Sequence, residues 1–136
     1  KIVYPSDVAT NDNGKRVGVS IDQLPTKNPI HDIGLDTLVK YISLIGEAGT
    51  IIANGPMGVF EDPEFAIGTR EIFQAIANSE GMTVVGGGET AMAFNQMGLA
   101  KGIEHISTGG GACISFMADE TMPALEAMRR SKIKFQ

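Results

Sequence analysis

The sequence predicts an α/β protein in which helices alternate with the strands of a parallel sheet. Short apolar runs of strand length recur along the chain, and most are followed by a segment with the three- and four-residue spacing of an amphipathic helix. Glycine or proline separates these segments, so the connections are short. This pattern is typical of a three-layer, mainly parallel, doubly wound sheet of the Rossmann-like type, with helices on both faces.

A short antiparallel edge element is predicted at the start of the chain. Residues 1–4 combine apolar and β-branched side chains, which favours a strand that ends at Pro5. Residues 11–15 form a polar turn, and the alternation of apolar and polar side chains in residues 17–21 indicates a second strand. We expect this pair to form a hairpin at the edge of the sheet.

The first predicted helix covers residues 34–48, where apolar side chains recur at intervals of three and four residues. Asp32 or Asp36 can cap its start, and Gly49 supplies its end. In chain order, the predicted elements that follow are strand 50–54, helix 69–79, strand 82–85, helix 89–97, strand 103–106 and a last helix from Pro123. The side chains that these helices are expected to bury are Ile72, Phe73, Ile76, Met92 or Ala93, Phe94, Met97, Leu125 and Met128.

The composition narrows the class of protein. The chain has 136 residues, of which 43% are hydrophobic and 20% charged, as expected for one globular domain. A net charge of −5 argues against non-specific binding to nucleic acid, and no apolar run is long enough to span a membrane. A single cysteine, Cys113, excludes an internal disulfide and suits a reducing cytosol. Because the chain starts with Lys1 in a predicted strand, we expect it to be a piece of a longer protein.

Two triple-glycine turns are the strongest functional signal. Residues 86–90 read Gly-Gly-Gly-Glu-Thr and residues 107–111 read Ser-Thr-Gly-Gly-Gly, and each follows a predicted strand. Carboxyl ends of parallel strands meet at one edge of a sheet, so both turns should lie beside residues 54–56, which follow another strand. Each triplet alone is compatible with a tight turn. Two of them on adjacent strands favour a phosphate site, because glycine turns at helix starts expose backbone N–H groups to an anion.

The motifs exclude two common phosphate loops. The sequence has no Gly-x-x-x-x-Gly-Lys-Ser/Thr, and Gly-x-Gly-x-x-Gly never follows a strand. Glu89 and Thr90 instead follow the first triplet. A carboxylate beside phosphates suggests that a divalent cation such as Mg²⁺ lies between them. Glu89 is equally suited to complement the dipole of a helix N-terminus.

Three motifs together resemble phosphoglycerate kinase, in its archaeal or bacterial form. They are residues 54–61 (Asn-Gly-Pro-Met-Gly-Val-Phe-Glu), residues 86–90 and residues 107–112, with Pro5-Ser6-Asp7-Val8 and Asp32-Ile33-Gly34 upstream. The resemblance implies reversible phosphoryl transfer between 1,3-bisphosphoglycerate and ADP, giving 3-phosphoglycerate and Mg-ATP. It also implies that residues 1–136 form the C-terminal portion of the nucleotide-binding domain. The N-terminal substrate domain and a glycine-rich lysine segment would then lie outside this chain.

The resemblance also implies roles for individual residues. Glu89 would ligate Mg²⁺, and Gly109, Gly110 and Gly111 would present N–H groups to the phosphoryl group in transfer. Glu61 would accept hydrogen bonds from the ribose. The other residues implied at the ATP or ADP site are Ile30, Pro56 and Val59 at the adenosine, and Asn54, Gly86, Gly87, Gly88 and Thr90 at the phosphates.

The chain departs from the family pattern at two positions. Glu89 stands where the family usually has aspartate, and Leu35 stands where it usually has the proline of Asp-x-Gly-Pro.

The arginines Arg70, Arg129 and Arg130 match no family role, and we expect them on solvated faces. Without the N-terminal domain and its arginine, the chain alone should be inactive. As part of a glycolytic enzyme, it is expected in the cytoplasm.

Other chemistry-bearing residues point to no second site. Cys113 is interpreted as a small packed residue, and His31 and His105 are given no catalytic role because neither has a neighbouring ligand at metal spacing. The methionines expected to fill the core are Met92, Met97, Met117, Met122 and Met128. Two alternatives to the kinase remain open: a non-catalytic nucleotide- or anion-binding module and, less favoured, a dinucleotide-dependent oxidoreductase.

Overall fold

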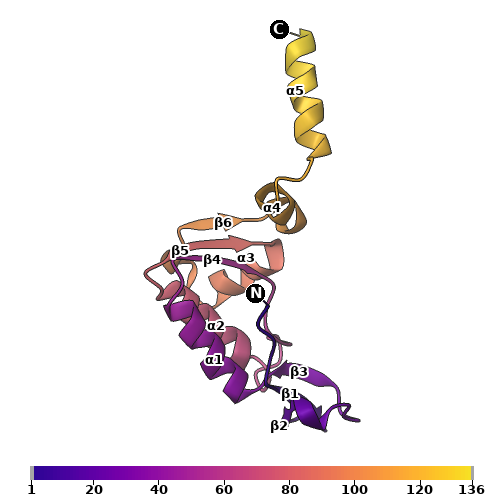
Figure 1. Cartoon of the computed structure of the whole chain (residues 1–136), viewed down its shortest axis with the longest axis vertical. Helices are drawn as coiled ribbons and strands as arrows, with labels where there is room; N and C mark the ends of the chain where they lie inside the picture. Colours follow the sequence, from indigo (N-terminus) through magenta and orange to yellow (C-terminus); the bar gives the residue numbers. More distant parts are fainter. Residues whose placement is uncertain (1, 136) are drawn as a thin grey trace.

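A computed structural model of the chain describes residues 2–135 (Figure 1). Single 3₁₀ turns at Ile21–Gln23 and Ala100–Gly102 interrupt the connections. The helices and strands, in chain order, are β1 (Asp7–Asp12), β2 (Lys15–Ser20), β3 (Ile30–Ile33), α1 (Leu35–Gly46), β4 (Thr50–Asn54), α2 (Ile67–Ala77), β5 (Met82–Gly86), α3 (Gly88–Gln96), β6 (His105–Ser107), α4 (Gly110–Met117) and α5 (Pro123–Phe135).

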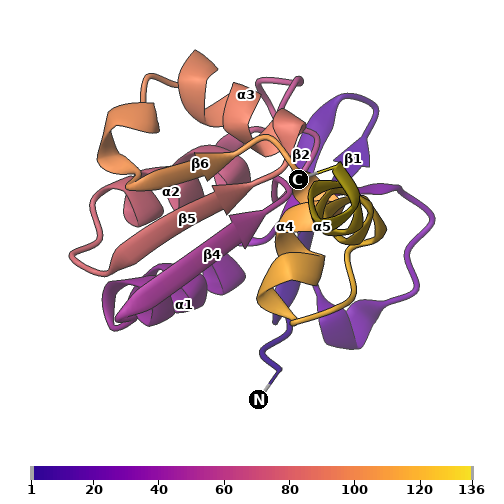
Figure 2. The same ribbon diagram turned by 90° about the horizontal axis from the view of Figure 1, so that it is seen from above.

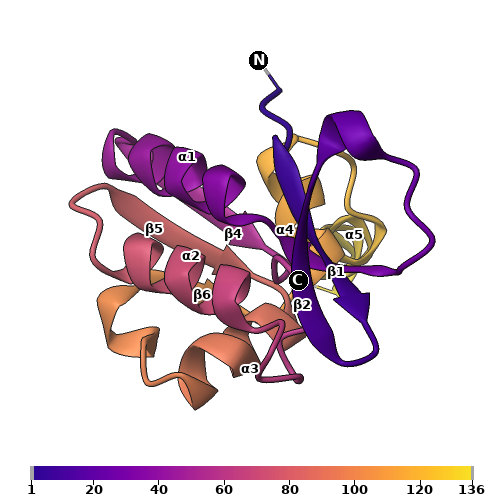
Figure 3. The same cartoon turned by 90° about the horizontal axis from the view of Figure 1, so that it is seen from below.

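The predicted α/β class is confirmed. Strands β4, β5 and β6 form a parallel sheet in that order. Helices α1, α2 and α3 lie along one face of this sheet, as Figure 3 shows from their side. Helix α4 lies on the other side, at the carboxyl ends of the strands (Figure 1). The sheet therefore directs its strand ends, and the loops that follow them, toward α4.

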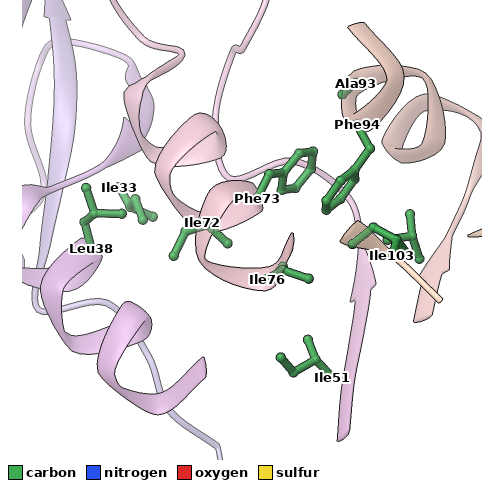
Figure 4. Packing of buried hydrophobic residues seen from close by; sticks show 10 residues of the cluster. Ile33, Leu38, Ile51, Ile72, Phe73, Ile76, Ala93, Phe94 and Ile103 are labelled. Carbon is green, nitrogen blue, oxygen red and sulfur yellow. The ribbon is translucent and has the colours of Figure 1, made fainter. Parts of the chain in front are cut away.

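The core lies between the parallel sheet and the three helices on its face. Figure 4 shows Ile51 of β4 and the apolar side chains of α2 and α3 pointing toward one another. Phe73 and Phe94 are fully buried, and their rings stack with centroids 4.0 Å apart. Burial of Ile72, Phe73, Ile76 and Phe94 confirms the predicted inward faces, and at the Met92–Ala93 pair it is Ala93 that is buried.

The antiparallel element differs from its prediction in two ways. The hairpin exists, but its first strand is β1 at Asp7–Asp12, whereas residues 2–4 form no strand and residue 1 lies outside the described residues. Strand β3, which was not predicted, pairs with the other side of β1, so the three strands form a sheet of their own. Burial explains this choice, because Val8 and Ala9 are buried in β1 while Ile2 is 90% exposed.

Helix α1 is capped from a distant strand. Neither Asp32 nor Asp36 provides the cap, so that prediction is wrong. The carboxylate of Asp7 accepts hydrogen bonds from the N–H of Thr37 (2.7 Å), the hydroxyl of Thr37 (2.6 Å) and the N–H of Asp36 (3.2 Å). Asp7 can reach this position because Gly34 has no side chain. An ideal Cβ on Gly34 would overlap the Asp7 carboxylate. A bond between β1 and α1 thus replaces a cap local in sequence.

Replacing Asp7 with alanine is expected to lower the free energy of unfolding by about 1–2 kcal/mol at neutral pH, because the first turn of α1 loses its acceptor. Partial burial raises the pKa of Asp7, but the bonds from Thr37 and Asp36 and the charge of Arg16 outweigh it and hold the pKa below the ordinary value of 3.8. The ionised carboxylate therefore stabilises the fold fully above that value, and this contribution disappears as the pH falls through the lower folded-state pKa. Urea unfolding of the intact protein at a series of pH values checks this, with Asp7→Asn as the variant whose stability should vary less in acid.

Helix α5 is not packed as predicted. Leu125 and Met128 are 39% and 68% exposed, so the expectation that they point inward is wrong for the described chain. The helix projects away from both sheets (Figure 1), and none of its residues is buried. Of the methionines expected in the core, Met97 packs against it, whereas Met92, Met117 and Met128 are exposed.

Candidate functional site

The carboxyl ends of the three parallel strands meet at one edge, as predicted. Asn54 at the end of β4 is the register partner of Gly86 in β5, and Gly86 is the partner of Ser107 in β6. Figure 2, which looks onto the sheet, shows these ends directed toward α4. The two glycine turns and the Asn54-Gly55 turn therefore lie side by side.

Hydrogen bonds join these turns to one another. The N–H of Gly87 donates to the carbonyl of Ser107 (3.0 Å), and the amide of Asn54 donates to the carbonyl of Gly110 (3.5 Å). Thr90, which is buried in the first turn of α3, accepts a bond from the N–H of Gly55 through its hydroxyl oxygen (2.8 Å). The three turns thus hold a fixed arrangement.

Two glycines are required by the backbone. Gly87 has a φ of +104°, a conformation that side chains disfavour, and it directs the chain from β5 into α3. An ideal Cβ on Gly110 would lie 3.3 Å from the Cα of Gly87, so the second turn approaches the first too closely for a side chain to fit freely. This contact between glycines brings the starts of α3 and α4 together.

Helices α3 and α4 both begin at the shared edge of the sheet, so their first N–H groups lie there. The first hydrogen bond of α3 is donated by Ala91 to Gly87 (2.9 Å), and the first of α4 by Cys113 to Gly109 (3.0 Å). The preceding N–H groups in each helix have no acceptor within it. Space beside the turns is open, because an ideal Cβ on Gly111 meets no atom within 4 Å and one on Gly88 meets only the carbonyl oxygen of Thr108 at 4.0 Å. Such an arrangement suits an anion with several oxygen atoms.

Glu89 lies in the first turn of α3 with an exposed side chain. Within residues 2–135, no group of three or more His, Cys, Asp or Glu side chains is placed to hold a metal ion. A single carboxylate beside an anion cradle nevertheless fits Mg²⁺, since this ion is commonly bound by one or two carboxylates together with phosphate oxygens and water. The donor set therefore fits a metal that arrives with a phosphorylated ligand.

The residues expected at the adenosine lie on β3 and on the loop after β4. The N–H of Val59 donates to the carbonyl of His31 (2.8 Å). Because His31 directly follows Ile30, this bond brings Val59 close to Ile30. Ile30 and Val59 are 51% and 41% exposed, so both present apolar surface to solvent. Glu61 is also exposed, and Pro56 is half-buried. The loop that begins at Asn54 thus connects the glycine turns with this second group.

The histidines, the cysteine and the arginines that were given no catalytic role either pack against neighbouring residues or lie exposed at the surface. His31 packs its ring edge-on against Phe65, with centroids 4.9 Å apart, and lies within hydrogen-bond distance of Asn11 (3.3 Å). Cys113 is half-buried, and its sulfur lies 3.4 Å from the position of a Cβ on Gly86. His105 is exposed. Arg70, Arg129 and Arg130 are also exposed, in agreement with the solvated faces predicted for these arginines.

Sequence reasoning missed three residues that organise the site. The side chain of Thr69 is fully buried and accepts bonds from the loop after β4. Arg16 and Asp32 form an ion pair of 2.7 Å beneath the same loop. Thr69 lies three residues before the apolar Ile72, and this helical spacing indicates that both side chains point to the same, inner face of the helix. No local pattern links Arg16 to Asp32.

Comparison with known proteins agrees with this geometry. The family model for phosphoglycerate kinase matches residues 1–120. The chain belongs to the phosphoglycerate kinase family. The match includes all three motifs of the site. In the described residues no helix is long and apolar enough to cross a membrane.

Curated phosphoglycerate kinases from archaea are similar to most of the chain. The enzyme of Methanothermus fervidus is 48% identical over 132 residues, which are 97% of this chain and 32% of that protein. The enzyme of Thermoplasma acidophilum is 45% identical over 136 residues, or 100% of this chain and 33% of that protein. The chain therefore spans about a third of the length of the phosphoglycerate kinases that it matches.

Solved phosphoglycerate kinases share the fold. The crystal structure of phosphoglycerate kinase from Pyrococcus horikoshii OT3 superimposes with a TM-score of 0.82 and 45% identity, covering 96% of this chain and 33% of that one. The structure of phosphoglycerate kinase from Coxiella burnetii gives a TM-score of 0.80 and 36% identity, covering 90% and 33%. The parallel sheet and the separate antiparallel sheet thus form part of a larger kinase chain in these relatives.

Proposed function

We propose that the protein containing this chain catalyses reversible phosphoryl transfer between 1,3-bisphosphoglycerate and ADP, giving 3-phosphoglycerate and Mg-ATP. The observation that carries this proposal is the close approach of two glycine turns, each opening a helix whose first N–H groups have no acceptor within the helix. Family membership supplies the reaction. Phosphoryl transfer asks the protein mainly to position its reactants and to stabilise charge, and backbone N–H groups do both.

The two glycine turns divide the work between them in this proposal. Gly86, Gly87 and Gly88 hold the nucleotide phosphates at the start of α3. Gly109, Gly110 and Gly111 present N–H groups at the start of α4 to the phosphoryl group as it moves. Because α3 and α4 are fixed against each other by the contact of Gly87 with Gly110, the donors need no rearrangement when negative charge develops.

Thr90 and Asn54 support the phosphates from the side of β4. The Thr90 oxygen already accepts a bond from Gly55, which leaves its hydroxyl hydrogen free to be donated to a phosphate oxygen. The Asn54 amide lies against the second glycine turn. Further along the same loop, Pro56, Val59 and Ile30 would form apolar walls for the adenine, and Glu61 would accept hydrogen bonds from the ribose hydroxyls.

Glu89 is proposed to hold Mg²⁺ together with the nucleotide phosphates. When bound, the ion neutralises charge on the phosphate oxygens. Glu89→Ala is expected to weaken Mg-dependent ADP binding by about tenfold or more, equivalent to about 1.4 kcal/mol. Glu89→Asp, which restores the residue usual in the family, should keep the affinity near that of the wild type. Calorimetric titration of ADP at several Mg²⁺ concentrations measures this.

A matched control and an opposing result are available for Glu89. Glu71 is an exposed glutamate on α2, and Glu71→Ala should leave the Mg²⁺ dependence unchanged. If Glu89 only complements the dipole of α3, its replacement lowers stability by about 0.3–1 kcal/mol and leaves the Mg²⁺ dependence as it was. That result would remove Glu89 from the metal site.

The remaining parts of the enzyme are proposed to lie outside this chain. Residues 1–136 would be the C-terminal portion of the nucleotide-binding domain, and an N-terminal domain would bind phosphoglycerate and supply cationic groups. Closure of two domains would exclude water from the reaction. As a glycolytic enzyme the protein would act in the cytoplasm. The chain alone is expected to be inactive, and in isolation it would act at most as a nucleotide- or anion-binding module.

Two measurements test the proposed function. Titration of the intact protein with Mg-ADP and, separately, with NAD should give binding of Mg-ADP alone; the absence of Mg-ADP binding would end the kinase proposal. A coupled assay of ATP formation from 1,3-bisphosphoglycerate and ADP should give turnover for the intact protein. Turnover by residues 1–136 alone would contradict the assignment of essential groups to the rest of the enzyme.

A further inference from the structure

The loop between β4 and α2 is fastened to the buried hydroxyl of Thr69. This residue is the third of α2, and its side chain has no exposed surface. Its oxygen accepts a hydrogen bond from the N–H of Met57 (3.1 Å) and a second from the N–H of Gly58 (3.3 Å). One oxygen atom thus fixes two successive peptide groups in the middle of the loop.

The opposite side of the loop is pressed against β3. Val59 donates its N–H to the carbonyl of His31 (2.8 Å). An ideal Cβ on Gly58 would lie 2.5 Å from that same carbonyl oxygen and 2.7 Å from a carboxylate oxygen of Asp32, so only glycine fits between the loop and the strand. The loop therefore has little freedom to move as long as its hydrogen bonds to the Thr69 oxygen hold.

The start of α2, which carries Thr69, is itself anchored. The N–H of Gly68 donates to the carboxylate of Asp32 (2.8 Å), and Asp32 is paired with Arg16 (2.7 Å). A carboxylate and an arginine from the antiparallel sheet thus set the position of α2, and Thr69 transmits that position to the loop. Side chains on either side of the fastened peptides, Pro56 and Val59, are those proposed to contact the adenine.

We propose that Thr69 is the positioning residue for the adenosine end of the nucleotide, an inference that rests on the proposed function. Because its side chain is fully buried, Thr69 offers no surface to a ligand and acts through the loop. Removal of its oxygen leaves two N–H groups without their acceptor, and the loop must shift to find others. The adenine walls then move, while the first glycine turn, which the N–H of Gly87 ties to the carbonyl of Ser107 in β6, keeps its place.

The test compares two ligands in the intact protein. ADP contains the adenosine, whereas inorganic tripolyphosphate offers phosphates alone, and both are titrated by calorimetry in the presence of Mg²⁺. Thr69→Val keeps the shape of the side chain and loses the oxygen, so it should weaken ADP binding about tenfold and change tripolyphosphate binding by less than about twofold. Thr69→Ser keeps the oxygen and should restore ADP affinity. In steady-state assays the KM for ADP should rise, with kcat and the KM for phosphoglycerate almost unchanged.

Thr83 provides the matched control. It is a buried threonine of β5 whose oxygen also accepts a backbone N–H, from Glu104 (3.1 Å), at the amino end of the parallel sheet. Thr83→Val should lower stability without altering the ratio of ADP to tripolyphosphate affinity. A change in that ratio as large as the one produced by Thr69→Val would overturn the inference, because it would reflect general loosening of the domain.

The remaining outcomes separate this inference from the proposed function. If the wild-type protein binds no Mg-ADP, the kinase proposal fails. If the wild type binds Mg-ADP and Thr69→Val binds it equally well, the kinase proposal stands and Thr69 is not a positioning residue. If Thr69→Val does not fold, hydrogen exchange in the wild type without ligand tests the inference instead. Slow exchange of the Met57 and Gly58 amides supports the proposed role of Thr69, and fast exchange overturns it.

Discussion

Replacing Asp32 with alanine is expected to lower the free energy of unfolding by about 3–5 kcal/mol, because it leaves the nearly buried guanidinium of Arg16 without its counter-charge. The Asp32 carboxylate has no exposed surface, and the Arg16 side chain is only 12% exposed. Besides Arg16, the carboxylate accepts bonds from the N–H groups of Ile33 and Gly68, both at 2.8 Å. The variant therefore also deprives the first turn of α2 of its acceptor.

Chemical denaturation of the intact protein measures this loss, and amide hydrogen exchange locates it in β3 and α2. Asp22→Ala is the matched control, since Asp22 is an exposed aspartate and its loss should change stability by no more than about 0.5 kcal/mol. The double variant Arg16→Met with Asp32→Ala should be more stable than Asp32→Ala, because no buried charge then remains unpaired. A loss below about 1 kcal/mol for Asp32→Ala would show that water reaches the Arg16 guanidinium.

The sequence alone was sufficient where the physical cause is local. Apolar spacing at three and four residues predicted α1, α2 and α3 to within about two residues of their ends. Strand–helix alternation predicted that Asn54, Gly86 and Ser107 would end neighbouring strands at one edge, and the register confirms it. The triple-glycine turns could be recognised because positive φ and close backbone approach are requirements that few other residues satisfy.

Tertiary partners explain what the sequence did not reveal. Asp32 precedes α1 in sequence, yet its carboxylate meets the start of α2, and the cap of α1 comes from Asp7, about thirty positions upstream of the N–H groups that it binds. In the same way, the position of Thr69 on the inner face of α2 gave no indication that its hydroxyl would bind the loop after β4. Such pairings depend on how two sheets and a helix come together, which no local pattern encodes.

For the last helix, α5, the sequence predicted the start of the helix but not what covers its apolar face. Pro123 does open α5, because proline is favoured at the first position of a helix, and the prediction of its start was correct. Its apolar spacing predicted an inward face, but Leu125 and Met128 remain exposed because the described chain offers them no surface to cover. Periodicity indicates that a face is apolar; it does not indicate which partner covers that face.

Gly87→Ala is expected to reduce kcat/KM of the intact enzyme by about 10²–10³, the size of effect seen when one hydrogen-bond donor to a developing negative charge is lost. Gly87 has a φ of +104°, so a side chain strains the turn from β5 into α3. An ideal Cβ there would lie 3.4 Å from the Thr90 hydroxyl oxygen, 3.7 Å from the amide oxygen of Asn54 and 3.8 Å from the Cα of Gly110. It would therefore stand among all three strand-end turns and separate the starts of α3 and α4.

Gly98 makes this experiment specific. It also has a positive φ, +73°, and follows the opposite end of α3, where an ideal Cβ meets no atom within 4 Å. Gly98→Ala thus imposes backbone strain on the same helix without placing an atom in the site, and it should cost stability while leaving kcat/KM within about twofold of the wild type. Equal losses of kcat/KM in the two variants would mean that α3 tolerates no strain at either end, and the assignment of Gly87 to the phosphate cradle would have to be withdrawn. A selective loss at Gly87, with tripolyphosphate binding weakened in parallel, follows only if the two glycine turns form one anion site.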